Sequence, residues 1–180
     1  MTHQIHFSEI DGVAFIKMES FADSRGLFSR LEFLDLPEPA LSSFAFSRNF
    51  LAGTTRGLHF QKPPHEQSKT IACLSGSIND YFLDLRQTST SYGKWASVRL
   101  TAESPDLLYL PKGLAHGFQA LEADTSLLYF FDKPFVQASS EVYSILDPIL
   151  NINLDLPITS ISESDRAAKY FSQEYGGFDS

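Results

Sequence analysis

Short runs of alternating or aromatic-rich residues recur along most of the chain, and turn-forming residues separate them. Alternation with a period of two places successive side chains on opposite faces of a β-strand, so each run predicts a strand with one buried face. Many short strands punctuated by turns are typical of a sandwich or a barrel. The predicted strands cover residues 13–18, 27–33, 44–49, 55–61, 69–74, 77–85, 95–100, 107–110, 117–121 and 126–131.

Turn residues separate these strands, and one helical pattern follows near the C-terminal end. Ser75-Gly76 predicts a tight hairpin between the runs on either side of it. Pro63-Pro64 cannot continue a hydrogen-bonded ladder, so a strand should end before it. Only residues 164–173 have a convincing helical pattern. We therefore expect an all-β fold with a short C-terminal helical tail.

The composition favours sheet over helix and bounds the size of the fold. The chain has 16 Phe and 7 Tyr, which favour strands, against one Trp. Its 180 residues suit one domain, and no internal repeat, linker or low-complexity tract divides them. We expect a single domain over residues 1–180, with a barrel core at about 40–135 and the N-terminal strands and C-terminal tail packed around it.

The charge and the cysteine content narrow the partners and the compartment. A net charge of -8 and a pI near 5.0 argue against nucleic acid or an anionic membrane surface as the main partner. The N-terminus lacks a cationic segment followed by an apolar run, and no stretch reaches the roughly 20 apolar residues of a membrane span. Cys73 is the one cysteine, so an intrachain disulfide is impossible. These features predict a cytoplasmic protein with neither a nucleic-acid nor a membrane partner.

Two segments each carry a histidine: Gly53-Thr-Thr-Arg-Gly-Leu-His59-Phe-Gln61 and Pro111-Lys-Gly-Leu-Ala-His116. They resemble the two signature motifs of cupins, which implies a cupin-type jelly-roll β-barrel with both imidazoles inside it. In cupins the first motif normally supplies His-x-His to a metal, whereas this chain has Gln61 at the second position. His59, Gln61, Glu66 and His116 would form a poor ligand set for a metal ion. The pattern favours acid–base chemistry without a metal.

Alternation also sets a geometric condition within the predicted strand 55–61. Arg56 and His59 fall on opposite faces of an ideal strand, so they cannot both face one cavity. Gly57 lies between them, and a glycine within a strand is a common position for a β-bulge. We predict an irregularity near Gly57 that turns both side chains toward one ligand.

A series of short segments carries a more specific match. The segments are Asp23-Ser-Arg-Gly-Leu-Phe28, Arg56-Gly-Leu-His-Phe-Gln61, Pro63-Pro-His-Glu-Gln-Ser-Lys69, Asp84-Leu-Arg86, Ser91-Tyr-Gly-Lys-Trp95, Leu110-Pro-Lys-Gly-Leu-Ala-His-Gly-Phe118, Asp147-Pro-Ile-Leu-Asn-Ile152 and Ile161-Ser-Glu-Ser-Asp165. In this order and spacing they resemble the dTDP-4-dehydrorhamnose 3,5-epimerases, cupin-fold enzymes that act on sugar nucleotides. The resemblance implies an isomerase of deoxysugar biosynthesis, in or near the dTDP-rhamnose pathway, that needs no metal or redox cofactor.

The implied reaction needs three kinds of side chain. A 4-keto group acidifies the hydrogens on C3 and C5, so the enzyme requires a base, an acid on the opposite face of the sugar and a group that stabilises the enolate. The resemblance assigns these roles to His59, Tyr129 and Lys69 respectively. Each residue has a structural alternative: a buried barrel histidine, a core aromatic and a solvated lysine. The family match favours the catalytic roles.

Asp165 matches the aspartate that pairs with the base in this family. Such a carboxylate orients the imidazole and stabilises the imidazolium. Ser162-Glu-Ser-Asp165 is also a capping-box-like sequence, in which the carboxylate would favour the first turn of the tail helix. The two interpretations are compatible only if that helix start packs against His59.

The resemblance also implies residues that bind the substrate, a nucleotide sugar. Arg25, Arg56 and His116 match recognition positions, because guanidinium groups bind phosphates bidentately and histidine donates to sugar or phosphate oxygens. Gln61 shares the strand face of His59 and is a candidate polar contact in the pocket. Arg25 lies in a segment that in this family approaches the site of a partner subunit, which implies a homodimer.

Several positions depart from the family pattern. Arg30 replaces a usual carboxylate, Ala72 a frequent arginine and Leu146 an expected tryptophan; residues 133–135 replace a tyrosine pair, and 44–49 lack a Gln-x-Asn element. These positions bear on specificity more than on catalysis, so another nucleoside diphosphate, another sugar, or inversion at C3 alone or C5 alone stays open. A non-catalytic cupin that binds a sugar nucleotide and a ketoisomerase on the same fold are the alternative functions.

Overall fold

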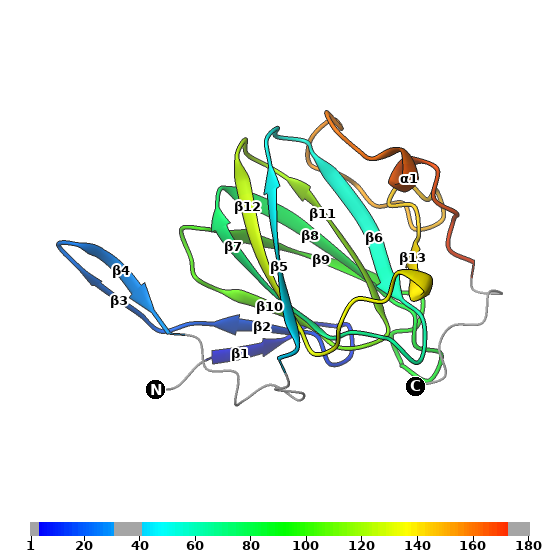
Figure 1. Cartoon of the computed structure of the whole chain (residues 1–180), viewed down its shortest axis with the longest axis horizontal. Helices are drawn as coiled ribbons and strands as arrows, with labels where there is room; N and C mark the ends of the chain where they lie inside the picture. Colours follow the sequence, from blue (N-terminus) through cyan, green and yellow to red (C-terminus); the bar gives the residue numbers. More distant parts are fainter. Residues whose placement is uncertain (1–3, 31–40, 173–180) are drawn as a thin grey trace.

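Two antiparallel β-sheets face each other in the computed structural model of the chain, which describes residues 4–30 and 41–172 (Figure 1). The first sheet has six strands in the order β1 (Gln4–Phe7), β2 (Ala14–Lys17), β10 (Leu107–Leu110), β7 (Lys69–Ser75), β12 (Thr125–Phe131) and β5 (Ser43–Asn49). The second has five in the order β13 (Ser140–Val142), β6 (Thr55–Gln61), β11 (Leu114–Ala120), β8 (Ser77–Asp84) and β9 (Trp95–Thr101). The other described elements are the hairpin of β3 (Ser20–Asp23) and β4 (Gly26–Ser29), the short 3-10 helix η2 (Gln137–Ser139) and the short helix α1 (Glu163–Arg166).

The prediction of an all-β, cupin-type jelly roll is confirmed. Within residues 4–30 and 41–172, no strand of one sheet pairs through backbone hydrogen bonds with a strand of the other, so the sheets face each other without closing into a barrel. The predicted strands 55–61 and 107–110 coincide with β6 and β10. The sequence pattern does not predict β1, β3 or β13.

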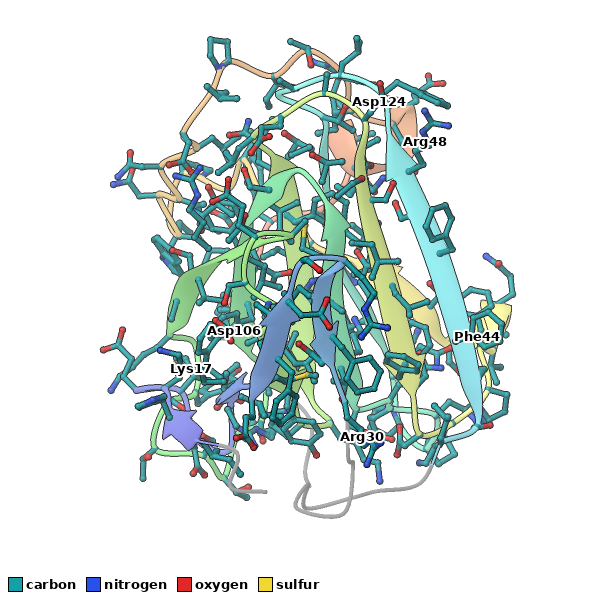
Figure 2. All side chains as sticks on the ribbon, turned by 90° about the vertical axis from the view of Figure 1, so that its left-hand side faces the viewer. Lys17, Arg30, Phe44, Arg48, Asp106 and Asp124 are labelled. Atoms are coloured by element: carbon teal, nitrogen blue, oxygen red, sulfur yellow. The ribbon has the colours of Figure 1, made fainter. Side chains whose placement is uncertain are left out.

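The β3–β4 hairpin extends away from the two sheets (Figure 1). It exposes the apolar side chains of Phe21, Leu27 and Phe28. β5 forms one edge of the six-stranded sheet and exposes Phe44, which is labelled on that strand in Figure 2. β4 ends at Ser29, and residues 31–33 of the predicted strand 27–33 lie outside the described residues. The molecule therefore presents apolar surface both on a projecting hairpin and on an open sheet edge.

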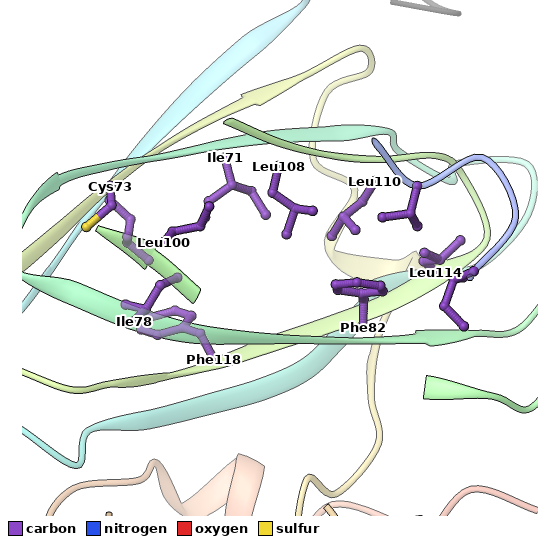
Figure 3. Packing of buried hydrophobic residues seen from close by; sticks show 12 residues of the cluster. Ile71, Cys73, Ile78, Phe82, Leu100, Leu108, Leu110, Leu114 and Phe118 are labelled. Atoms are coloured by element: carbon purple, nitrogen blue, oxygen red, sulfur yellow. The ribbon is translucent and has the colours of Figure 1, made fainter. Parts of the chain in front are cut away.

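The main hydrophobic cluster fills the space between the sheets (Figure 3). Ile71 and Leu108 enter it from the six-stranded sheet, and Ile78, Phe82 and Phe118 enter it from the five-stranded sheet. Alternate residues of the facing strands therefore supply the core, as expected for two packed antiparallel sheets.

The prediction of a hairpin at Ser75-Gly76 is wrong, because the strands on either side of it belong to different sheets. β7 pairs with β10 and β12 in one sheet, whereas β8 pairs with β11 and β9 in the other, so Gly76 carries the chain from one sheet to the other. Hydrophobic burial explains why the chain crosses between the sheets here, because Ile71 of β7 and Ile78 of β8 pack into the same cluster from opposite sides. A β7–β8 hairpin would place both strands in one sheet and remove this packing.

The segment after β13 covers the outer face of the five-stranded sheet, where Phe171 packs in a second hydrophobic cluster with Leu58. The helix predicted over residues 164–173 is consequently wrong in its length. α1 ends at Arg166, the described residues after it are not helical, and residue 173 of the predicted helix lies outside the described residues. The Phe171 N–H donates to the Asp147 carboxylate at 2.7 Å. Tertiary packing outweighs the local helical pattern. No helix in the described part of the chain is long and apolar enough to span a membrane.

Candidate active site

A cavity of about 350 Å³ opens between the two sheets beside the main hydrophobic cluster. The inward faces of the strands carry polar and aromatic residues here instead of aliphatic ones. The five-stranded sheet contributes His59 and His116 to the lining, and the six-stranded sheet contributes Lys69, Tyr129 and Phe131. Strand alternation thus turns chemistry-bearing residues from distant parts of the sequence toward one space.

The predicted irregularity at Gly57 is confirmed. His116 of β11 lies opposite His59 and Phe118 lies opposite Arg56, so β6 has one more residue than β11 between these pairs. Gly57 has a φ of +103°, which residues with a Cβ rarely adopt, and a Cβ there would collide with the β11 backbone. As a result, Arg56 and His59 both line the cavity.

Asp165 holds the imidazole of His59. His59 Nε2 donates to Asp165 Oδ1 at 2.8 Å, and the Gly57 N–H donates to Oδ2 at 3.2 Å. Burial alone would raise the pKa of Asp165, but the hydrogen bond and charge of His59, together with the Gly57 N–H, bring this pKa below its usual value. Ser162 accepts from the Asp165 N–H at 3.0 Å and caps α1. The helix start therefore packs against His59, so the two interpretations of Asp165 are compatible.

Lys69 crosses from the six-stranded sheet toward the same imidazole. Its Nζ donates to the backbone carbonyl of His59 at 3.0 Å. Burial lowers the pKa of Lys69 to about 8, although the nearby Asp80 acts in the opposite direction. Near neutral pH the ammonium is therefore charged, and it is able to stabilise a negative oxygen in the cavity.

Tyr129 lies on the wall formed by β12. Its ring meets His116 edge-on, with centroids 5.9 Å apart, and stacks on Phe131 at 6.1 Å. Burial raises the pKa of Tyr129 well above its usual value; the charge of Asp80 adds to this increase and that of Arg56 opposes it. The phenol consequently stays protonated at neutral pH and is able to donate its proton only to a strong base.

A second histidine–carboxylate pair, which the sequence analysis missed, lies in the same wall as His59. His116 Nε2 donates to Asp80 Oδ2 at 2.7 Å, and both side chains are buried. Burial opposes charge on both groups, raising the pKa of Asp80 and lowering that of His116. Asp80 Oδ1 has no hydrogen-bond partner within the described residues. Asp80 lies between Ile78 and Phe82 on the inward face of β8. A carboxylate at a position that strand alternation turns into the core is the sequence signal that would have identified it.

Gln61 also lines the cavity, but its amide is engaged by two loops. Its Nε2 donates to the His65 carbonyl at 2.8 Å, and its Oε1 accepts from the Val136 N–H at 2.7 Å. A ligand contact would use the second N–H or the second lone pair of this amide.

Arg25 lies apart from the cavity of its own chain. It occupies the turn between β3 and β4, where its side chain is 88% exposed and its Nη2 lies 2.6 Å from an Asp23 carboxylate oxygen. The described structure of one chain therefore brings His59, Lys69, Tyr129, Arg56, His116 and Gln61 to one cavity, with Asp165 behind His59, but leaves Arg25 outside it.

The arrangement is suited to moving protons across a bound molecule. His59 and Tyr129 belong to facing sheets and line the same cavity. A proton is therefore able to leave one face of a carbon acid toward one sheet and return from the other sheet. Within the described ranges, no group of three or more His, Cys, Asp or Glu side chains is placed to hold a metal ion.

Comparisons with known proteins agree on one family. The chain matches the sequence model of dTDP-4-dehydrorhamnose 3,5-epimerase over residues 8–173. It is 35% identical over 160 residues to the dTDP-4-dehydrorhamnose 3,5-epimerase of Sinorhizobium fredii (strain NBRC 101917 / NGR234), and this match covers 85% of this chain and 82% of that protein. It is 32% identical over 164 residues to the dTDP-4-dehydrorhamnose 3-epimerase of Streptomyces niveus, covering 88% and 79%. The crystal structure of dTDP-4-dehydrorhamnose 3,5-epimerase from Bacillus anthracis str. Ames with TDP and PPi bound has a TM-score of 0.89 at 29% identity, over 94% of this chain and 100% of that one.

Proposed function

Because the chain belongs to the dTDP-4-dehydrorhamnose 3,5-epimerase family, we propose that His59, Tyr129 and Lys69 carry out epimerisation in the cavity between its sheets. The protein is an isomerase that inverts C3, C5 or both in a nucleotide-linked 4-keto-6-deoxy sugar of deoxysugar biosynthesis. The observation that supports the residue assignment most directly is that His59 and Tyr129 line one cavity from facing sheets.

His59 begins the reaction by accepting the proton next to the ketone. Its Nε2 is engaged with Asp165, so Nδ1 is the nitrogen that is free to act as base. The electron pair of the broken C–H bond moves to the C4 oxygen and forms an enolate. The Asp165 carboxylate stabilises the imidazolium, and the Lys69 ammonium stabilises the enolate oxygen.

Tyr129 completes the inversion from the opposite face of the sugar. Its raised pKa keeps the phenol protonated until the carbon of the enolate is ready to accept a proton. The proton leaves toward β6 and arrives from β12, so the configuration at that carbon is inverted. Exchange with solvent then removes the proton from His59 and restores the proton of Tyr129.

We propose a thymidine diphosphate sugar as the substrate, inverted at both C3 and C5. The S. fredii relative is named as a 3,5-epimerase of a dTDP sugar, and the B. anthracis structure holds TDP and PPi. Arg56 borders the cavity, and its guanidinium suits a diphosphate, while His116 and Gln61 are placed for polar contacts with the ligand. Inversion at C3 alone is the second candidate, because the S. niveus relative is named as a 3-epimerase.

Incubation with a dTDP-4-keto-6-deoxy sugar in deuterated water tests the function. We expect NMR to detect deuterium at both C3 and C5, because each carbon receives its new hydrogen from a solvent-exchanged Tyr129. Deuterium at C3 alone would select the single inversion. Transfer of the keto group to another carbon would indicate a ketoisomerase. Absence of deuterium at every carbon, for several nucleoside diphosphates, would contradict an enzymatic function and leave a binding protein.

We also propose that the enzyme works as a homodimer in which the β3–β4 hairpin of one subunit packs against the open edge of the other. The hairpin exposes Phe28 and the edge strand β5 exposes Phe44 and Phe46, which are 72% and 60% exposed. Contact between subunits would bury these side chains. It would also carry Arg25, which lies in the hairpin turn, toward the partner's cavity.

Mixing two inactive variants tests this assembly. Arg25→Ala and His59→Ala should each abolish or strongly reduce turnover. If Arg25 serves the partner's site, mixed dimers contain one site with both residues, and activity returns on mixing. If the mixture stays as inactive as its components, while light scattering detects dimers that exchange subunits, Arg25 does not act across the interface.

We further propose a cytoplasmic location. Cys73 is the one cysteine of the chain, and it is free and buried. A protein without disulfides suits a reducing compartment. Fractionation of the native host is the corresponding measurement, and recovery of the protein outside the cytoplasmic fraction would contradict this location.

A further inference from the structure

Arg56 is restrained by one side-chain hydrogen bond within the described part of the chain. Its Nε donates to Oδ1 of Asn49 at 3.0 Å, which leaves the other guanidinium N–H groups for a ligand. Arg56 borders the active-site cavity and also a second cavity of about 420 Å³, which Thr54 and Ser160 help to line. An arginine in this position has many accessible rotamers unless a neighbour restrains it.

Asn49 is well suited to provide that restraint. It is the last residue of β5 and is only 1% exposed. Its Nδ2 donates to the Thr125 carbonyl at 3.2 Å and to Ser47 Oγ at 3.4 Å. Because a carbonyl only accepts, the NH₂ group must face Thr125 and the amide oxygen must face Arg56. The orientation of the acceptor is therefore set by the protein itself.

We propose that Asn49 is a positioning residue that orients the Arg56 guanidinium toward the diphosphate of the substrate, a role that rests on the function proposed above. The guanidinium is planar, so fixing the direction of Nε–H also fixes the direction of the remaining N–H groups. Asn49 belongs to the six-stranded sheet and Arg56 to the five-stranded sheet, so this hydrogen bond joins the two sheets beside the cavity. Restraint before binding reduces the conformational entropy lost on binding, which strengthens substrate affinity more than the chemical step.

Asn49→Ala tests the role through two independent readouts. In steady-state kinetics we expect KM for the nucleotide sugar to rise about tenfold, the effect expected from losing a hydrogen bond to a charged group, while kcat changes by less than about twofold. In calorimetry we expect Kd for dTDP and for inorganic pyrophosphate to rise by a similar factor. An unchanged Kd, or a fall in kcat at constant KM, would overturn the positioning role.

A double substitution tests whether Asn49 acts through Arg56. In an Arg56→Met background the guanidinium is absent, so adding Asn49→Ala should weaken dTDP binding no further. A further loss of about tenfold in that background would mean that Asn49 acts by another route, and it would overturn the proposal.

Thr125→Ala is the matched control for a merely structural effect. The buried Thr125 hydroxyl donates to the Glu122 carbonyl at 2.8 Å, so this change loosens the same end of the β5–β12 pair but keeps the bond between Asn49 and Arg56. We expect a lower unfolding temperature with an unchanged Kd for dTDP. Equal weakening of dTDP binding in Thr125→Ala and Asn49→Ala, at equal loss of stability, would overturn the proposal.

Failure of the proposed function is distinguishable from failure of this inference. If the wild-type protein incorporates no deuterium into any sugar, but Asn49→Ala weakens pyrophosphate binding only when Arg56 is present, the function fails and the positioning role stands. If deuterium exchange proceeds and Asn49→Ala binds dTDP like the wild type, the positioning role fails and the function stands.

Discussion

Three ionisable side chains in or beside the cavity reach different protonation states because their neighbours differ. Burial disfavours the charged form of Lys69, Tyr129 and Asp165 alike. Asp165 nevertheless stays ionised because His59 and a backbone N–H donate to it, whereas Tyr129 keeps its proton and Lys69 has a pKa lowered to about 8. The neighbours of each residue therefore separate an ionised carboxylate, suited to support the proposed base, from a protonated phenol, suited to the proposed acid.

The pKa of Lys69 predicts how activity depends on pH. Only the ammonium form stabilises the enolate, and it is lost as pH rises through about 8, so kcat/KM should fall above that pH. The measurement is the initial rate of deuterium incorporation between pH 6 and 10. Lys69→Met should lower the rate about 100-fold or more and remove this limb of the profile. A wild-type rate that stays constant up to pH 10 would exclude Lys69 as the enolate-stabilising cation.

Asp165→Asn tests the support given to His59. An amide keeps the shape but removes the negative charge that stabilises the imidazolium, so we expect kcat to fall about 100-fold or more with little change in KM. Ser162→Ala is the control, because it removes the cap of α1, costs about 1 kcal/mol of stability and leaves the His59–Asp165 bond in place. Nearly wild-type kcat in Asp165→Asn would leave Asp165 without a catalytic role.

At the scale of single elements, β6 brings the proposed base His59 and the proposed diphosphate ligand Arg56 to one cavity through one irregular residue. At Gly57, β6 has one more residue than β11. The extra residue breaks the strand alternation between Arg56 and His59, so both side chains face the same side. Close approach of the two backbones makes glycine necessary there, because any Cβ would lie 2.5 Å from the Gly117 Cα.

Gly57→Ala should therefore destabilise the fold and damage the site together. We expect a loss of about 3 kcal/mol or more in the free energy of unfolding, because both the φ of +103° and the β11 backbone oppose a side chain. Gly26→Ala is the control: Gly26 has a φ of +136° but no atom within 4 Å of its Cβ position, so only the backbone strain of about 1–2 kcal/mol should appear. Urea unfolding at matched protein concentration measures both. Equal losses in the two variants would contradict the importance of the close approach at Gly57.

Local patterns account well for elements whose burial follows strand alternation. They predict β6 and its irregularity, because both depend on residues within the strand itself. They fail at Ser75-Gly76. Whether the chain forms a hairpin there or crosses to the other sheet depends on the pairing of β7 and β8 with strands far along the sequence. They also fail after Arg166, where the burial of Phe171 against another sheet outweighs helix propensity.

At the scale of the whole molecule, the facing sheets divide the chemistry between them. The five-stranded sheet holds His59 and the His116–Asp80 pair, and the six-stranded sheet holds Lys69 and Tyr129. The hydrophobic cluster between the sheets sets their separation, so packing in the core positions His59, the proposed base, relative to Tyr129, the proposed acid. The family resemblance pointed to His59, Tyr129, Lys69 and Asp165 as candidates without showing this division, because the matched residues carry no information on which strands share a sheet.

Solvent-exchange stereochemistry in two variants tests the central claim most directly, namely that His59 and Tyr129 act on opposite faces of the sugar. In deuterated water, Tyr129→Phe should exchange the hydrogen next to the ketone without inverting the carbon, because His59 removes the proton and returns deuterium to the same face. His59→Ala should exchange nothing. Inversion by Tyr129→Phe at the wild-type rate, or exchange by His59→Ala at the wild-type rate, would contradict the account.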